Sequence, residues 1–156
     1  MRKHITILFI LFSITTLFSQ TTLKAKVIGI KDGDTVVVLD SLNNQITLRL
    51  AEVDCPEKNQ PFGTKAKQFT SDQIYLQTIK YVVTDTDRYG RSIAIIYYDT
   101  DNKYLSAEII KAGMGWHYKR YSTSKELALL EENAKKNKIG LWVESNPIEP
   151  SEWRKN

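Results

Sequence analysis

Six charged side chains of two chemical types lie where the sequence predicts strand ends and tight turns: Asp32, Asp34, Arg49, Asp54, Glu57 and Arg91. In a small barrel the strand ends converge on one mouth, so residues that are distant in the sequence meet there. Carboxylate and backbone oxygens form a hard site that suits Ca²⁺ or Mg²⁺ and not zinc. The chain has only 2 histidines, too few for an imidazole metal site. The pattern therefore predicts a cation site beside guanidinium groups, which bind anions.

Each of these residues also has a purely structural explanation. Asp-Gly is a common hairpin turn, an Asp before a turn often caps its own backbone, and an Arg on a strand is usually solvated. Aromatic side chains at four positions suit base stacking, but they equally suit a core or its rim: Tyr89, Trp116, Tyr118 and Tyr121. No single residue identifies the site, so the argument depends on their joint order.

The composition limits the kind of protein this is. The chain has 156 residues, with 22 basic against 18 acidic side chains and 42% hydrophobic residues. It is too apolar for a disordered chain and lacks the Gly or Pro repeat of a fibre, and its length suits one compact domain. Because Cys55 is the single cysteine, no internal disulfide can form. The fold must therefore be stabilised by its apolar core.

The first twenty residues have the layout of a secretory signal peptide. Arg2 and Lys3 precede an uncharged, mostly apolar run from Ile5 to Phe18, and Ser19 follows as a small residue near a cleavage site. The run is shorter than the roughly 20 apolar residues of a membrane span. We expect residues 1–20 to be cleaved, which predicts a secreted or periplasmic protein with no stable membrane association. The mature chain keeps 20 basic and 18 acidic residues, so its bulk charge does not argue for a polyanion partner.

Short apolar runs separated by turn residues predict five strands. The first two form a hairpin around the turn at Asp32-Gly33. The third alternates Ile46, Leu48 and Leu50 with polar residues, which directs Arg49 away from the core. The five predicted strands are residues 27–30, 35–39, 45–51, 79–83 and 92–98.

Helical patterns follow the third strand and the fifth strand. One helix is predicted after Pro61, a second ends at Gly113, and a third begins with a capping box at Thr123 and Glu126 and ends at Gly140. Strands grouped three plus two predict a mainly β, α+β fold, a five-stranded OB-fold Greek-key barrel with about three helices. Residues 144–156 are rich in Pro, Glu, Ser and Lys and are predicted to be a surface C-terminal tail.

Three motifs in this order resemble the staphylococcal nuclease family. They are Lys-Asp-Gly-Asp-Thr at 31–35, Leu-Arg-Leu-Ala-Glu-Val-Asp-Cys-Pro-Glu at 48–57 and Asp-Arg-Tyr-Gly-Arg at 87–91. Further similarity lies at 62–70, 107–113 and 139–142. The resemblance covers about residues 23–142, and three separate motifs in the right order make a chance match improbable. It implies a staphylococcal-nuclease-like OB-fold domain over residues 21–143.

The resemblance also implies a calcium-dependent phosphodiesterase that acts on DNA and RNA, leaves 3′-phosphates and is a monomer. Asp34 and Asp54 would be carboxylate ligands of Ca²⁺, and Cys55 would contribute its backbone carbonyl. Glu57 would hold or deprotonate the attacking water. Arg49 and Arg91 would bind the scissile phosphate, while Arg88, Tyr89 and Tyr121 would contact the substrate nucleotides.

The chain departs from the family pattern at two places. Cys55 stands where the best-known member has Thr, and the loop from Lys58 to Phe62 is shorter than in that member, which leaves the substrate preference open. The main alternative to an enzyme is a non-catalytic OB-fold module that binds nucleic acid. Glu57 argues against this alternative because a pure binder has no use for an acid at the water position. A calcium-stabilised structural or carbohydrate-binding domain would not need Arg91.

Overall fold

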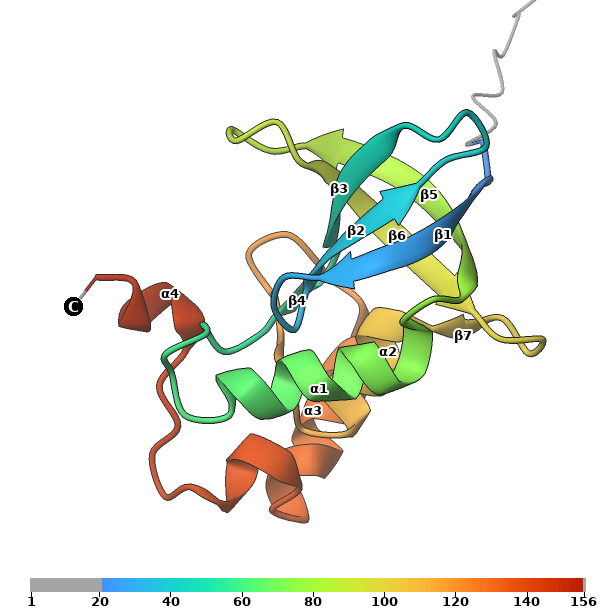
Figure 1. The fold of residues 1–156 in the computed structure, drawn as a ribbon. Helices are drawn as coiled ribbons and strands as arrows, with labels where there is room; N and C mark the ends of the chain where they lie inside the picture. Colours follow the sequence, from blue (N-terminus) through green and yellow to red (C-terminus); the bar gives the residue numbers. More distant parts are fainter. Residues whose placement is uncertain (1–20, 156) are drawn as a thin grey trace, which may run out of the picture.

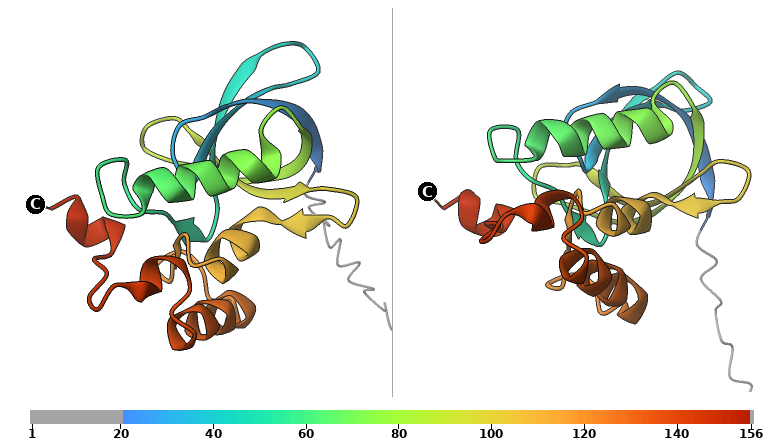
Figure 2. Two further views of the ribbon diagram at one scale, coloured as in Figure 1. Left: turned by 60° about the horizontal axis from the view of Figure 1, so that its bottom comes forward. Right: turned by 90° about the horizontal axis from the view of Figure 1, so that it is seen from below.

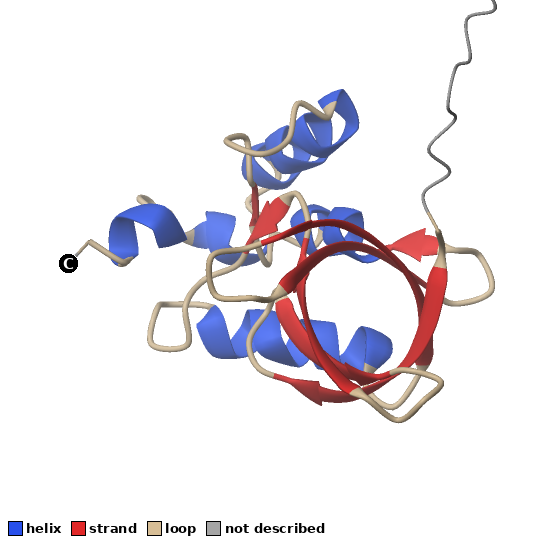
Figure 3. Cartoon of the chain, turned by 90° about the horizontal axis from the view of Figure 1, so that it is seen from above, coloured by secondary structure: helices blue, strands red, loops and turns tan. Residues whose placement is uncertain are grey.

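Five strands close into a barrel, as the sequence predicts. The structure is a computed structural model that describes residues 21–155, so the predicted signal peptide at residues 1–20 lies outside the described residues. The main sheet has the order β3-β2-β1-β5-β6-β7, and a parallel pairing of β3 with β6 closes it. Figure 3 shows the resulting ring of strands from one end. The barrel strands are β1 (Leu23–Ile30), β2 (Thr35–Leu39), β3 (Gln45–Leu50), β5 (Thr78–Thr86) and β6 (Ser92–Tyr98).

The barrel closes because two of its strands bend. The β1–β2 register shifts between Val27 and Gly29, and the β5–β6 register shifts between Val83 and Asp85. Such irregularities increase local twist and let a short sheet curl on itself. The interior is filled by apolar side chains that are fully buried, among them Val27, Val36, Leu48, Ile79 and Ile96. This alternation of inward apolar residues is the pattern that predicted the strands.

Three short strands lie outside the barrel proper. β7 (Lys103–Tyr104) pairs with the end of β6, and β4 (Val53–Asp54) pairs with β8 (Trp116–His117) in a separate two-stranded sheet. In that small sheet Asp54 lies opposite Trp116. The pairing therefore holds a predicted site residue at the edge of the barrel.

Helices cover one end of the barrel (Figures 1 and 2). α1 (Gly63–Ile74) and α2 (Leu105–Lys111) both contact barrel strands, and α3 (Lys125–Lys136) packs against α2. A 3₁₀ helix (Gly140–Val143) and the short helix α4 (Pro150–Trp153) follow. No helix in residues 21–155 is both long and apolar enough to cross a membrane.

Both predicted boundaries of the third helix were wrong by a few residues. Ser124 and not Thr123 is the N-cap, because the Ser124 hydroxyl accepts a hydrogen bond from the Leu127 amide at 3.3 Å. This start puts Leu127 into the core. The helix ends at Lys136, before Gly140, whose positive φ of 60° instead allows it to pack against the backbone of Gly113. A Cβ at Gly140 would lie 2.2 Å from the Gly113 carbonyl oxygen.

Candidate active site

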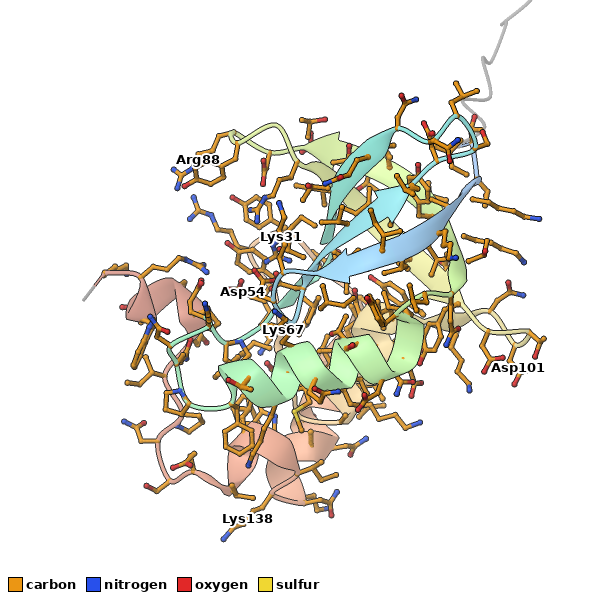
Figure 4. The ribbon with its side chains drawn as sticks, viewed as in Figure 1. Lys31, Asp54, Lys67, Arg88, Asp101 and Lys138 are labelled. Atoms are coloured by element: carbon orange, nitrogen blue, oxygen red, sulfur yellow. The ribbon has the colours of Figure 1, made fainter. Side chains whose placement is uncertain are left out.

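All nine residues that the sequence singled out for metal, catalysis or substrate line one cleft at the mouth of the barrel: Asp34, Arg49, Asp54, Cys55, Glu57, Arg88, Tyr89, Arg91 and Tyr121. They come from the β1–β2 turn, the end of β3, β4 and the loop after it, the β5–β6 turn, and the segment after β8. In Figure 4 the labelled Arg88 and Asp54 lie on the side of the molecule that faces α4, whereas Asp101 lies at the opposite end. Segments far apart in sequence thus meet at one place.

Arg49 links the two aspartates at the centre of the cleft. Its Nη2 lies 3.3 Å from Oδ2 of Asp34 and 3.0 Å from Oδ1 of Asp54. Its Nη1 donates to the backbone carbonyls of Leu50 and Val53, at 2.7 and 2.9 Å. All three charged side chains are nearly buried, with exposed fractions of 11%, 9% and 5%. The guanidinium is therefore fixed, with its two carboxylate partners held on one side.

Local structure explains why these groups converge. β2 pairs with β3 so that Thr35 lies opposite Arg49, which places the neighbouring Asp34 beside that arginine. The Cys55 amide donates to Oδ2 of Asp34 at 2.7 Å. Gly33 makes this approach possible, because a Cβ there would lie 2.7 Å from the Cβ of Cys55. The glycine of the Asp-Gly turn thus has a packing role as well as a turn role.

Arg91 is linked to Asp34 from the β5–β6 side through the Thr35 hydroxyl. Its Nη1 donates to the Thr35 hydroxyl at 3.3 Å, and that hydroxyl donates to Oδ1 of Asp34 at 3.1 Å. Its Nε forms an ion pair with Asp87 at 2.6 Å. Asp87 also accepts from the backbone amides of Tyr89 and Arg91, which shapes the turn. Arg91 and Arg49 therefore flank Asp34, with Arg91 oriented by its own turn.

Glu57 lies beside Asp54 and has a partner that the sequence did not indicate. Its Oε1 lies 2.6 Å from Nη1 of Arg154, while Nη2 of the same arginine lies 3.2 Å from Oδ2 of Asp54. Arg154 directly follows α4, inside the segment predicted as a surface tail. The composition of this segment does not predict the contact, because Arg154 lies about a hundred residues away from Glu57 and Asp54 in the sequence.

Aromatic and basic side chains form an exposed rim around the charged centre. Tyr89 and Tyr121 are 69% and 66% exposed. The Arg88 guanidinium lies 4.8 Å from the centre of the Tyr89 ring and donates to its hydroxyl. Tyr121 packs edge-on against Tyr118, with ring centres 4.9 Å apart. Exposed rings beside guanidinium groups suit stacking with bases.

Burial and crowding disfavour the ionised forms of two acids in the cleft. Burial, and after it the neighbouring charge of Asp34, raises the pKa of the Asp54 carboxyl to about 6. Asp32 lies in the β1–β2 turn, two residues before Asp34. Burial and the charge of Asp34 also raise the pKa of Asp32 to about 6. Burial also raises the pKa of the Cys55 thiol well above its usual range. The thiol therefore stays protonated and uncharged. Cys55 contributes polar groups to the cleft through its backbone.

The donor chemistry of the cleft fits a hard divalent cation. Within residues 21–155, no group of three or more His, Cys, Asp or Glu side chains is placed to hold a metal by itself. Asp34 and Asp54 instead offer two carboxylates that share one cationic partner, Arg49. Burial disfavours the ionised form of Asp54, and a bound cation would offset this cost. Backbone oxygens and water complete such sites in proteins.

A second polar network fixes the turn between Arg49 and Asp54. Glu52 lies in that turn with a positive φ of 65°. Its carboxylate accepts from the Ser122 hydroxyl at 2.6 Å and from the Tyr104 hydroxyl at 2.8 Å, and its backbone carbonyl accepts from the Tyr118 amide. Ser122 is also 2.9 Å from Nε2 of His117. Sequence reasoning missed Glu52 because its three partners come from distant segments.

Comparison with known proteins identifies nucleases among the relatives of this chain. The family model described as "Staphylococcal nuclease homologue" matches residues 47–144. An uncharacterized endonuclease of Haemophilus influenzae is 40% identical over 151 residues, covering 97% of this chain and 84% of that protein. A micrococcal nuclease of Shigella flexneri is 34% identical over 142 residues, which is 85% of this chain and 80% of the relative.

A plant relative matches this chain over part of a longer protein. A staphylococcal-like nuclease of Arabidopsis thaliana is 36% identical over 115 residues, covering 74% of this chain but only 34% of that protein. The family model covers β3 and the later barrel strands, while the Haemophilus influenzae relative aligns with 97% of the chain. The chain belongs to the staphylococcal nuclease homologue family, and its relatives support a nuclease function.

Proposed function

We propose that the chain is an exported, calcium-dependent nuclease that hydrolyses phosphodiester bonds of DNA and RNA and leaves 3′-phosphates. The observation that carries the proposal is the position of Arg49, whose Nη2 lies 3.3 Å from Asp34 and 3.0 Å from Asp54. An arginine fixed against two buried carboxylates sets an anion-binding group beside a cation-binding one. That combination matches the needs of phosphodiester hydrolysis, in which a metal and guanidinium groups share the phosphate oxygens.

Phosphodiester hydrolysis is slow because an anionic phosphate repels a nucleophile. Asp34, Asp54 and the Cys55 carbonyl would hold Ca²⁺, which would supply positive charge against the negative charge that develops on the phosphate. Arg49 and Arg91 bind the equatorial oxygens, since a guanidinium can hold two oxygens at once and stays charged. On substrate binding, both arginines would exchange some of their hydrogen bonds to aspartates for hydrogen bonds to the phosphate.

Glu57 is the carboxylate for the attacking water, which it holds or deprotonates. A carboxylate is a weak base at neutral pH, so a cation bound at Asp34 and Asp54 would assist by acidifying this water. Arg88, Tyr89 and Tyr121 bind the flanking nucleotides on the exposed rim. Backbone charge and base stacking do not read sequence, which favours broad specificity for both nucleic acids. The predicted signal at residues 1–20 supports export, and we propose a monomer.

The Glu57→Gln variant separates an enzyme from a non-catalytic binder. The amide keeps the size of the side chain but cannot accept a proton from water. With a single-stranded oligonucleotide and Ca²⁺, we expect the wild-type protein to cut and leave 3′-phosphate ends, whereas Glu57→Gln should bind with similar affinity and cut at least about 100-fold more slowly. A wild-type protein that binds the oligonucleotide without cutting it would establish the binding module instead.

A further inference from the structure

The C-terminal segment brings a further guanidinium group into the cleft. Arg154 spans two carboxylates, with Nη1 2.6 Å from Glu57 and Nη2 3.2 Å from Asp54. Figure 1 shows α4, which Arg154 follows, beside the loop that leads from β4 to α1. The family match ends at residue 144, so this arginine lies beyond the matched domain. It therefore belongs to the segment that follows the matched domain.

The C-terminal segment is tied to the same loop that carries Glu57. The buried Gln60 side chain accepts from the Glu57 amide at 3.0 Å and donates to the Ile148 carbonyl at 2.6 Å. Pro150, at the start of α4, is buried as well. One side chain thus connects the backbone of Glu57 with the segment that ends in Arg154, and their relative position is set by two hydrogen bonds.

The Arg154 contact differs from an ordinary surface ion pair of this protein. Lys103 is equally exposed, at 43%, but it pairs with the single exposed carboxylate of Asp99 four residues away. Arg154 instead holds two acids at once, and Asp54 is only 5% exposed. Exposed single pairs contribute little, whereas a fork on two carboxylates fixes both orientations.

We propose that Arg154 is a positioning residue, which clamps the carboxylates of Glu57 and Asp54 in the relative orientation that the reaction needs. The inference rests on the proposed function, because it assigns Arg154 a role through the water-binding acid. Small displacements of such a group reduce turnover strongly even when substrate still binds. Arg154 also places a positive charge against a predicted metal ligand. The clamp therefore weakens cation binding while it supports turnover.

These two effects give Arg154→Ala a signature that simple destabilisation does not share. We expect kcat at saturating Ca²⁺ to fall about tenfold with KM nearly unchanged. Titration calorimetry with Ca²⁺ alone should show the cation bound about threefold more tightly, because a repelling charge is gone. Arg154→Lys keeps the charge but has one nitrogen donor, so its Ca²⁺ affinity should stay near the wild-type value while its kcat remains low. Lys103→Ala, which removes an equally exposed cation elsewhere, should change neither quantity.

The outcomes separate this inference from the function on which it depends. A kcat of Arg154→Ala equal to the wild-type value overturns the positioning role, and a higher kcat would make Arg154 a plug that blocks the site. Weaker Ca²⁺ binding together with lower kcat would mean that the substitution merely loosens the cleft, which also overturns the proposal. A wild-type protein without nuclease activity would reject the proposed function, and the inference with it.

Discussion

The strand that carries Arg49 sets the direction of its side chain, and the cleft residues around it set its burial. Its alternation on β3 turns it away from the barrel interior, yet it is only 11% exposed because two acids and two backbone carbonyls surround it. Arg91 is held less completely, with Asp87 and Thr35 as partners. Both arginines keep donor groups directed at the cleft, which is the arrangement expected of groups that bind a phosphate.

Replacing either arginine with alanine should remove part of the transition-state stabilisation. For Arg49→Ala and Arg91→Ala we expect kcat/KM to fall on the order of 100-fold or more, about 3 kcal/mol in barrier, because each guanidinium faces charge that develops on the phosphate. The measurement is the cleavage rate of a fluorescent oligonucleotide in Ca²⁺. Lys80→Ala, which removes a surface cation bound to Asn102, is the control and should keep the wild-type rate. An unchanged kcat/KM in either arginine variant would remove that residue from the mechanism.

Asp54 is a site residue that the fold holds at a cost in stability. Its pKa in the folded protein is about 6, above the ordinary value of 3.8. The folded state therefore takes up a proton before the unfolded chain does as the pH falls, so the ionised form destabilises the metal-free fold at neutral pH and this cost disappears in acid.

Asp54→Asn should expose this cost directly. In EGTA at pH 7.5 we expect the variant to have a higher free energy of unfolding than the wild-type protein, by on the order of 1 kcal/mol. The difference should shrink as the pH is lowered to 4.5, where the wild-type carboxyl becomes neutral. Denaturant unfolding measures both values, and Asp101→Asn in an exposed turn serves as the control. A variant that is less stable than the wild-type protein at pH 7.5 would contradict the electrostatic argument.

Short connections between elements, more than the strands themselves, bring the site residues together. The β1–β2 turn packs against Cys55 through Gly33, and the β3–β4 turn is fixed through Glu52 by hydroxyl groups from two other segments. Arg91 and Asp87 organise the β5–β6 turn between themselves. Each connection carries a charged residue of the cleft, so its shape controls the geometry of the site.

Gly33→Ala tests this dependence on a connection. The added Cβ would lie 2.7 Å from the Cβ of Cys55 and 2.9 Å from the Cβ of Ala66, so the turn must shift away. We expect a loss of about 1–3 kcal/mol in the free energy of unfolding and a lower kcat/KM, because Asp34 follows directly. At Gly29 an added Cβ would meet its nearest atom at 3.5 Å, which makes Gly29→Ala the matched control. Equal stability of the two variants would show that the close approach is unimportant.

Local patterns predicted the elements well, but they predicted the long-range contacts poorly. Inward apolar residues such as Leu48 and Ile96 marked the barrel strands, because a small closed sheet buries alternate positions. The cap of α3 was predicted one residue early, since Thr123 and Ser124 are chemically similar and only packing of Leu127 selects between them. The contacts of Arg154 and the partners of Glu52 form only when the chain is folded, so no local pattern predicts them.

For the molecule as a whole, the order of the motifs predicted the convergence of the site. Three short motifs were sufficient because the barrel topology brings their turns to one mouth. Arg154 escaped prediction because neither composition nor spacing links residue 154 to Glu57, and only the docking of α4 does so. The cleft is thus predictable where it depends on strand order and unpredictable where it depends on the C-terminal segment.

The central claim is that these distant residues form one calcium-dependent catalytic centre. The most direct test measures the initial rate at which the wild-type protein cuts circular single-stranded DNA, in Ca²⁺ and in excess EGTA. Circular DNA has no ends, so every cut must be internal. We predict conversion of circles to linear fragments in Ca²⁺ and at least a 100-fold lower rate in EGTA, because the carboxylate pair needs its cation to offset phosphate charge. Cutting at the same rate in EGTA, or no cutting in Ca²⁺, would contradict it.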